Sequence, residues 1–148
     1  GAMLIAFIAL IALLNGILIS IGGWFGLENL TLENILGYVF APLAFAIGVP
    51  WEEAIGAGSF IGQKLILNEF VAYSNFGPVI GDFSDKAAMI ISFALCGFAN
   101  FSSMAILIGG LGGLAPAKRS TIAQLALKAV VAGMLASLLS AAIAGMFM

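Results

Sequence analysis

The sequence predicts an all-α, polytopic membrane protein, in which several helices cross the bilayer. Of its 148 residues, 63% are hydrophobic and only 8% are charged, whereas about 25% of the residues in soluble domains are charged. The mean hydropathy is +1.20. Three segments, residues 1–27, 87–117 and 129–148, contain no charged residue. Each is long enough to cross a bilayer core, which takes about 20 apolar residues.

The composition also excludes several classes of function. The chain has no histidine, which removes histidine-based catalysis and histidine metal ligands. Its single cysteine, Cys96, can form neither an internal disulfide nor a zinc site, and we interpret it as a packed small residue. Five basic residues provide no basic surface for nucleic acid. We therefore expect that the protein is not an enzyme, that it has no catalytic or metal-binding residue, and that it does not bind nucleic acid.

The first transmembrane helix is expected in residues 1–29. Residues 3–21 are an apolar run in which Asn15 is the one strongly polar side chain, and Gly22 and Gly23 end the run. A run of this length and composition is typical of a membrane-spanning helix.

The next helix, in residues 30–48, has a different character. Thr31 can cap its start, and Glu33 lies favourably in its first turn. Its apolar residues form one broad face, but Gly37 and Pro42 interrupt it. A poor membrane span and a helix lying in the membrane interface both fit this pattern, and we favour the interfacial helix.

Residues 50–78 are predicted to form a re-entrant hairpin of two half-length helices. Proline at position 50 followed by two acidic residues is typical of a helix start. Four polar residues then lie near the middle of the segment, where exposure to lipid would be costly. Interrupted structure at membrane depth is tolerated where it is buried or lines a cavity. These four residues are Gln63, Lys64, Asn68 and Glu69.

Glu69 is the strongest candidate for a functional residue in this hairpin. A carboxylate inside apolar sequence at membrane depth indicates a functional site by default, where it could accept hydrogen bonds from a polar solute or bind a cation. The alternative is a structural pair with Lys64. Residues five apart lie about 140° apart around a helix, so this pair would require a break between them.

A broken transmembrane helix is predicted in residues 86–114. The uncharged segment 87–117 is too long for one straight span, and Asn100, Ser102 and Ser103 lie in its middle. Asn100 and Ser103 share one face if the local backbone is helical. They could bind a polyhydroxylated solute or hold helices together, and their spacing leaves both possibilities open.

The last transmembrane helix is predicted in residues 120–147. The basic loop at Lys118 and Arg119 before it is expected in the cytoplasm by the positive-inside rule. Small residues recur every four positions in two parallel stripes, which favours close packing against another helix over a substrate-lining face. The stripes are Ala129, Gly133, Ser137, Ala141 and Gly145, and Ala132, Ala136, Ser140 and Ala144.

Two stretches of the chain resemble the concentrative nucleoside transporter family, in its bacterial branch. The first comprises residues 48–51 (GVPW) and 62–73 (GQKLILNEFVAY). The second comprises residues 94–103 (ALCGFANFSS), followed by GGLG at 109–112. The resemblance implies the C-terminal half of an inverted-repeat transporter. It also implies nucleoside symport coupled to sodium or protons, by alternating access.

The resemblance also assigns roles to individual segments and residues. It implies that residues 1–29 belong to a scaffold around which three protomers assemble, and that residues 49–148 form a moving transport domain. Glu69, Asn100 and Ser103 match ribose-binding positions of the family, and Phe98 matches a neighbouring aromatic contact.

The resemblance further implies that the nucleobase contacts and the coupling cation lie mainly in an N-terminal half absent from this sequence, and that this chain itself holds no cofactor. The expected partners are a nucleoside, the lipid bilayer, that N-terminal half and two further copies in a homotrimer. The expected location is the bacterial inner membrane, crossed several times.

Two other functions remain open at this point. In one, the chain is a channel or pore-forming subunit with Glu69 lining the path. In the other it is a purely structural membrane subunit, in which Glu69, Asn100 and Ser103 could be replaced without functional effect.

Overall fold

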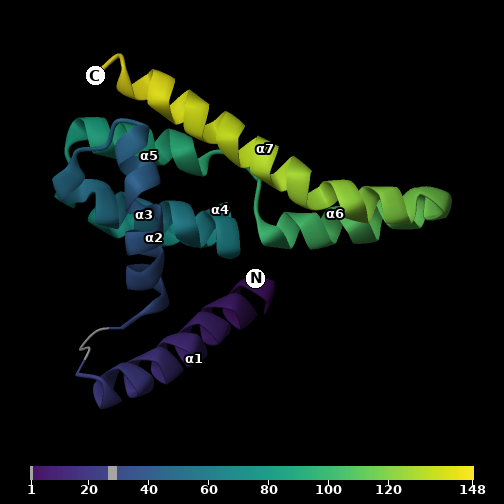
Figure 1. Cartoon of the computed structure of the whole chain (residues 1–148), viewed down its shortest axis with the longest axis horizontal. Helices are drawn as coiled ribbons and strands as arrows, with labels where there is room; N and C mark the ends of the chain where they lie inside the picture. The colour runs from purple at the N-terminus through teal and green to yellow at the C-terminus, as the bar shows by residue number, and fades with distance from the viewer. Residues whose placement is uncertain (1, 27–29) are drawn as a thin grey trace.

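The computed structural model describes residues 2–26 and 30–148, and every regular element in these two ranges is a helix (Figure 1). The prediction of an all-α chain is therefore confirmed. Residues 1 and 27–29, which belong to the predicted first segment, lie outside the described residues.

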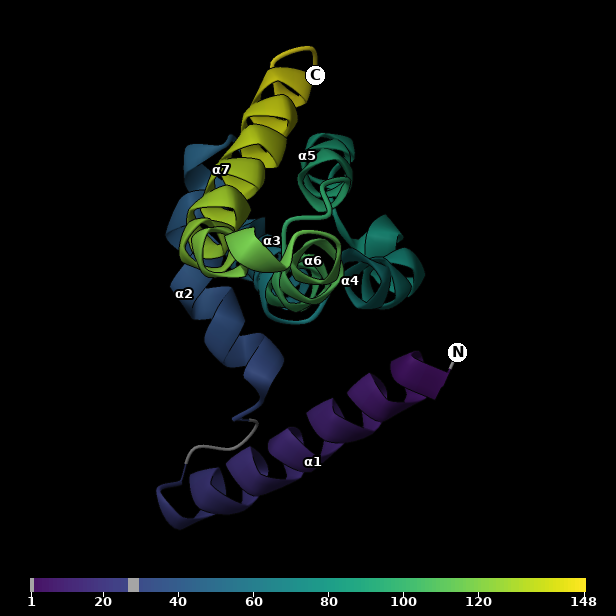
Figure 2. The ribbon, with the colours of Figure 1, turned by 90° about the vertical axis from the view of Figure 1, so that its right-hand side faces the viewer.

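Helix α1 (Ala2–Trp24) lies apart from the other helices in both ribbon views (Figures 1 and 2). It reaches helix α2 (Leu32–Ala46) through Asn15. The Asn15 side-chain oxygen accepts a hydrogen bond from the Leu32 backbone N–H at 2.7 Å, and its amide donates to Glu33 Oε2 at 2.9 Å. The one strongly polar side chain of α1 thus satisfies a backbone donor at the start of α2.

Helices α2 and α3 (Trp51–Ile66) pack with their backbones almost in contact. The chain turns by 116° between them, and Gly48 supplies the positive φ of +105° in the connection. A Cβ placed on Gly58 would lie 2.7 Å from both the Ala41 nitrogen and the Gly37 oxygen. Gly37 and Gly58 therefore weaken each helix locally but permit their close crossing.

The predicted interruption in residues 50–78 is confirmed. Helix α3 ends at Ile66, and helix α4 (Glu69–Phe76) begins after a two-residue break. The 3₁₀ helix η1 (Gly77–Asp82) follows. Three phenylalanines, Phe60, Phe76 and Phe83, pack edge to face with ring centroids 5.2 to 6.0 Å apart and hold the two helices together beyond the break.

The second predicted interruption is also confirmed. Helix α5 (Asp85–Leu95) and helix α6 (Phe101–Leu114) are separated by residues 96–100. After the short η2 (Pro116–Lys118), helix α7 (Arg119–Gly145) runs back alongside α6 and then across α5 (Figures 1 and 2).

Within the described residues, one helix is long and apolar enough to span a membrane, namely Pro116–Gly145 with a mean hydropathy of 1.9 over its most apolar window. The bent pair α2 and α3 would count as a second if it formed a single span. Helix α6 and the Ala12–Trp24 part of α1 are apolar but shorter.

One hydrophobic core joins α2, α3, α4, α5 and α7. Gly145 lets α7 approach α5 closely, because a Cβ there would lie 2.6 Å from the Ile90 side chain. The buried members are Ala41, Ala44, Val49, Ala54, Ala57, Phe60, Ile61, Ala72, Phe76, Ala87, Ile90, Ile91, Ala94, Leu95, Leu138 and Ala141.

The predicted packing face of the last helix is only partly right. The first stripe is buried at Ser137, Ala141 and Gly145, but Ala129 at its start is exposed. The second stripe is offset by about 60° around the helix. Three of its members, Ala132, Ala136 and Ser140, are exposed because α5 covers only one side of α7.

We predict that Gly58→Ala destabilises the complete protein by about 1–3 kcal/mol, the usual cost of overpacking, because the new methyl group would meet backbone atoms of α2. Thermal unfolding in detergent measures the loss. Gly77→Ala is the matched control, since no atom lies within 4 Å of its Cβ position. Equal melting temperatures for the two variants would show that α2 and α3 are not in backbone contact.

Candidate functional site

A new helix starts after each helix break, and an asparagine caps each start. Asn68 Oδ1 accepts a hydrogen bond from the Val71 backbone N–H at 2.9 Å. Asn100 Oδ1 accepts one from the Ser103 N–H at 2.7 Å, and Ser103 Oγ accepts one from the Asn100 N–H at 3.2 Å. This reciprocal capping box satisfies backbone donors that would otherwise have no partner.

The two breaks meet at a hydrogen bond between Glu69 and Asn100. The Asn100 amide donates to Glu69 Oε2 at 2.8 Å. Asn100 is only 3% exposed, and its oxygen already caps α6, so its NH₂ group is held toward the carboxylate. Glu69 is half-buried. Among the described residues its other oxygen, Oε1, accepts no hydrogen bond, so the carboxylate retains capacity for a polar ligand.

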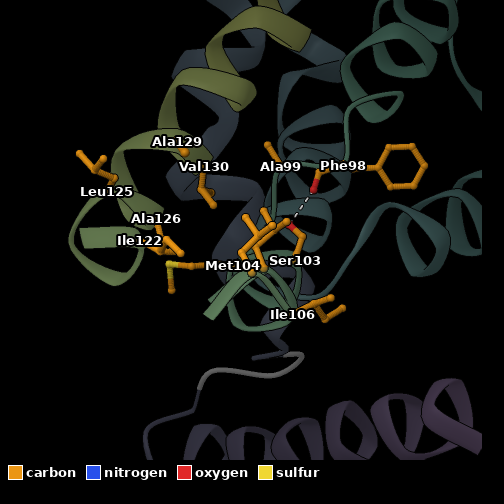
Figure 3. Close-up of a pocket in the computed structure, with 12 residues that line it drawn as sticks. Phe98, Ala99, Ser103, Met104, Ile106, Ile122, Leu125, Ala126, Ala129 and Val130 are labelled. Carbon is orange, nitrogen blue, oxygen red and sulfur yellow. Dashed lines mark hydrogen bonds between the residues drawn. The ribbon is translucent and has the colours of Figure 1, made fainter. Parts of the chain in front are cut away.

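Ser103 and Phe98, the other two predicted site residues, flank this pair. The Ser103 hydroxyl donates to the Phe98 carbonyl oxygen at 2.7 Å. The Phe98 ring is 75% exposed and points away from the α7 residues in Figure 3. The structure thus brings Glu69, Asn100 and Ser103 into one hydrogen-bonded group and leaves the Phe98 ring beside it.

A concavity of about 530 Å³ opens beside the carboxylate. Three of its six lining residues are aromatic, and the Glu69 carboxylate is its one charged group. Its lining residues are Glu69, Phe70, Tyr73, Ser74, Cys96 and Phe98.

A second, almost wholly apolar cavity of about 500 Å³ lies between α6 and α7 (Figure 3). Met104 from α6 points toward Ile122 from α7 across it, and Ile106, Leu125 and Ala126 also line it. Phe98 and Ser103 also line this cavity. The chain segment at the α5–α6 break therefore borders both spaces.

Sequence reasoning missed two residues of this region. Tyr73 donates its hydroxyl to the Ser92 carbonyl oxygen at 2.6 Å and lies 3.3 Å from Cys96 Sγ. Tyr73 follows Glu69 by four residues, and this spacing on a helix could have indicated a shared face. Cys96 is exposed in the wall of the concavity, so its interpretation as a packed residue is wrong. The break removes the helical neighbours that would have covered it.

Glu69 and Lys64 form no direct ion pair among the described residues, although their charges interact at longer range. The Lys64 ammonium donates to the Ala94 carbonyl oxygen and to Ser137 Oγ, each at 2.7 Å. Glu69 instead takes its hydrogen bond from Asn100. The two charged side chains leave the α3–α4 break toward different elements.

The arrangement suits the recognition of a polar, uncharged ligand with an apolar part. A carboxylate accepts hydrogen bonds from hydroxyl groups, an amide can donate one, and an exposed aromatic ring offers an apolar face.

Known proteins resemble this chain over nearly its whole length. Residues 1–145 match the family described as Na+ dependent nucleoside transporter C-terminus. The chain is 74% identical over 147 residues to the uncharacterized transporter YutK of Bacillus subtilis, covering 99% of this chain and 36% of the relative. It is 53% identical over 152 residues to the nucleoside permease NupC of Helicobacter pylori, with coverage of 99% and 36%.

A solved structure shares the same fold. CNTnw in an inward-facing substrate-bound state matches with a TM-score of 0.96 and 57% identity, over 99% of this chain and 37% of that one. The chain thus spans little more than a third of the length of these relatives.

We predict that Asn100→Ala lowers the stability of the complete protein more than Asn100→Ser does. Serine retains an N-cap acceptor, whose loss typically costs about 1 kcal/mol, and both variants lose the amide that donates to Glu69. Unfolding without ligand in detergent measures the difference. Equal losses would mean that the Asn100 oxygen does not hold the start of α6.

Proposed function

The chain belongs to the Na+ dependent nucleoside transporter family, as its C-terminal part, and we propose that it supplies the ribose side of the site in a cation-coupled nucleoside symporter. Its relatives are transporters and permeases rather than enzymes, and the family places the protein in a membrane. Because the chain spans 36% of the length of its bacterial relatives, the transport cycle requires the remainder of the protein.

The observation that carries the proposal is the contact between Glu69 and Asn100 beside an open concavity. A ribose presents two neighbouring hydroxyl groups. These can donate to the Glu69 carboxylate, and hydrogen bonds to a charged acceptor are stronger than neutral ones. The Asn100 amide donates to Glu69 Oε2 and, at 3.3 Å, to the Phe98 carbonyl oxygen. It can donate to the same sugar by exchanging one of these bonds, and because its capping role fixes the side chain, the entropic cost is small.

Ser103 and Phe98 complete the proposed ribose subsite. The Ser103 oxygen is part of the capping box, which places a hydroxyl beside Asn100. The exposed rings of Phe98 and Phe70 border the concavity and can cover the apolar face of a nucleoside. A ligand without the ribose hydroxyls would leave buried polar groups unpaired, and this penalises its binding.

We propose the following division of the chain within the transporter. Residues 1–29 form a scaffold helix, residues 30–48 an interfacial helix, and residues 49–148 a transport domain with a re-entrant hairpin at 50–78. The separation of α1 from the common core supports such a division, since α1 reaches α2 through Asn15. Alternating access then moves the core helices relative to α1.

The remaining features of the proposal concern the whole protein. The coupling cation, sodium or a proton, and the nucleobase are bound mainly by the N-terminal half, which this chain complements as one part of an inverted repeat. The assembly is a homotrimer in the bacterial inner membrane, with several spans per protomer. Broken helices that meet at a site of polar groups are a recurrent feature of secondary transporters.

We predict that Glu69→Gln in the complete transporter weakens uridine binding by about 10- to 100-fold. Hydrogen bonds to a charged group contribute about 1.5–3 kcal/mol against about 1 kcal/mol for neutral ones, and about 1.4 kcal/mol corresponds to a factor of ten. A nucleoside that lacks the 2′- and 3′-hydroxyls loses much less, because it never makes these bonds. Calorimetric titration of both ligands provides the comparison.

Glu52→Gln serves as the matched control, since Glu52 is exposed at the start of α3. This substitution should leave the affinities for both nucleosides unchanged. If Glu69→Gln weakened the binding of both nucleosides equally, Glu69 would interact with the hairpin or with a cation and not with the ribose. Uptake of labelled uridine separates a transporter from a channel lined by Glu69. A transporter predicts uptake that saturates and that unlabelled uridine inhibits.

A further inference from the structure

Lys64 places a positive charge in the interior of the fold. Its side chain is 2% exposed, although lysine is almost never fully buried without a partner. Its nitrogen donates to the Ala94 carbonyl oxygen and to Ser137 Oγ, both at 2.7 Å. Both direct partners are neutral oxygens, and the Glu69 carboxylate acts on the ammonium only at longer range, so a direct ion pair does not account for its burial.

The Ala94 carbonyl belongs to the last turn of α5, where the chain breaks. The last carbonyls of a helix lack the usual partner four residues ahead, and they form the negative end of the helix dipole. Around this end the Tyr73 hydroxyl donates to Ser92 O, the Cys96 N–H donates to Phe93 O, and Lys64 donates to Ala94 O. The α3–α4 hairpin therefore supplies two of these three donors.

The second partner is oriented to accept. Ser137 Oγ donates its own proton to the Met134 carbonyl oxygen at 2.9 Å, so its lone pairs are available to the Lys64 ammonium. Gly97 lines the same space, because a Cβ there would lie 3.3 Å from the Lys64 nitrogen and 2.9 Å from Ser137 Cβ. The ammonium thus occupies a small space bounded by oxygens from α5 and α7 and by the glycine of the break.

Backbone carbonyls at the ends of broken helices hold small cations in secondary transporters, and here such a carbonyl, together with a hydroxyl, holds the Lys64 ammonium. We propose that the Lys64 ammonium is a tethered cation at the α5–α6 break, occupying a position for which an inorganic cation would otherwise be required. It joins α3, α5 and α7 into one unit, whatever the driving ion. If Lys64 occupies this position, the cation that drives nucleoside transport must bind elsewhere. This consequence rests on the proposed function.

The test is chemical rescue in the full-length transporter. Lys64→Ala removes the ammonium and leaves its space, so we expect a melting temperature in choline chloride lower than that of the wild type by about 5 °C or more. Ethylammonium chloride at equal ionic strength should restore at least half of that loss, since it can occupy the vacated position and stabilise the folded state by binding. Choline is too large to do so.

Wild type and Lys86→Ala should respond equally to the two salts, because Lys86 is exposed on α5 and its removal creates no internal space. Absence of rescue in Lys64→Ala would overturn the proposal. Lys64→Met keeps the length of the side chain without its charge. A melting temperature equal to that of the wild type for this variant would also overturn the proposal.

Ser137→Ala keeps the proposal testable if the Lys64 variants do not fold. It removes one acceptor from the ammonium, so its melting temperature should fall further than that of Ser140→Ala. The Ser140 hydroxyl is exposed on the same helix and bonds only its own turn. Equal shifts for the two serine variants would contradict the assignment. These measurements need no nucleoside, so their outcome is independent of whether uridine binding is lost in the Glu69 variant.

Discussion

The structure depends on one constraint, which is that the backbone groups freed at two helix breaks must find partners inside the fold. An apolar surrounding offers no water to satisfy them. Asn68 and Asn100 cap the helices that begin after the breaks, while Tyr73 and Lys64 bind carbonyls where α5 ends. The asparagine caps lie within their own breaks. The Tyr73 and Lys64 contacts cross from the α3–α4 pair to the end of α5, and Ser102 Oγ donates in the other direction to the Leu67 carbonyl oxygen at 3.0 Å.

The same contacts create the candidate site. Asn100 can present its amide to Glu69 because its oxygen is already committed to the start of α6. A side chain held in this way is pre-organised, and ligand binding then costs less entropy. Stability and recognition therefore share residues at the breaks. Away from them the fold relies on close packing, as at Gly58 and Gly145, where a side chain would collide with a neighbouring helix.

Local signals explain what the sequence could predict. Polar residues in the middle of apolar segments located both breaks, and Thr31 and Glu33 marked the start of α2, because capping depends on residues a few positions apart. Partners distant in the chain left no such signal. Lys64 lies five residues from Glu69 but binds Ser137, 73 positions away. The exposure of Cys96 and of one stripe of α7 likewise depends on which helix faces them, which periodicity alone does not specify.

The central claim is that Glu69 and Asn100, joined across the two breaks, form the ribose side of a nucleoside site. A structure of the complete transporter with uridine bound tests it most directly. We expect the ribose hydroxyl oxygens within about 2.5–3.2 Å of the Glu69 carboxylate and the Asn100 amide, the range of true hydrogen bonds. A ribose bound elsewhere, with a cation against Glu69, would contradict the account.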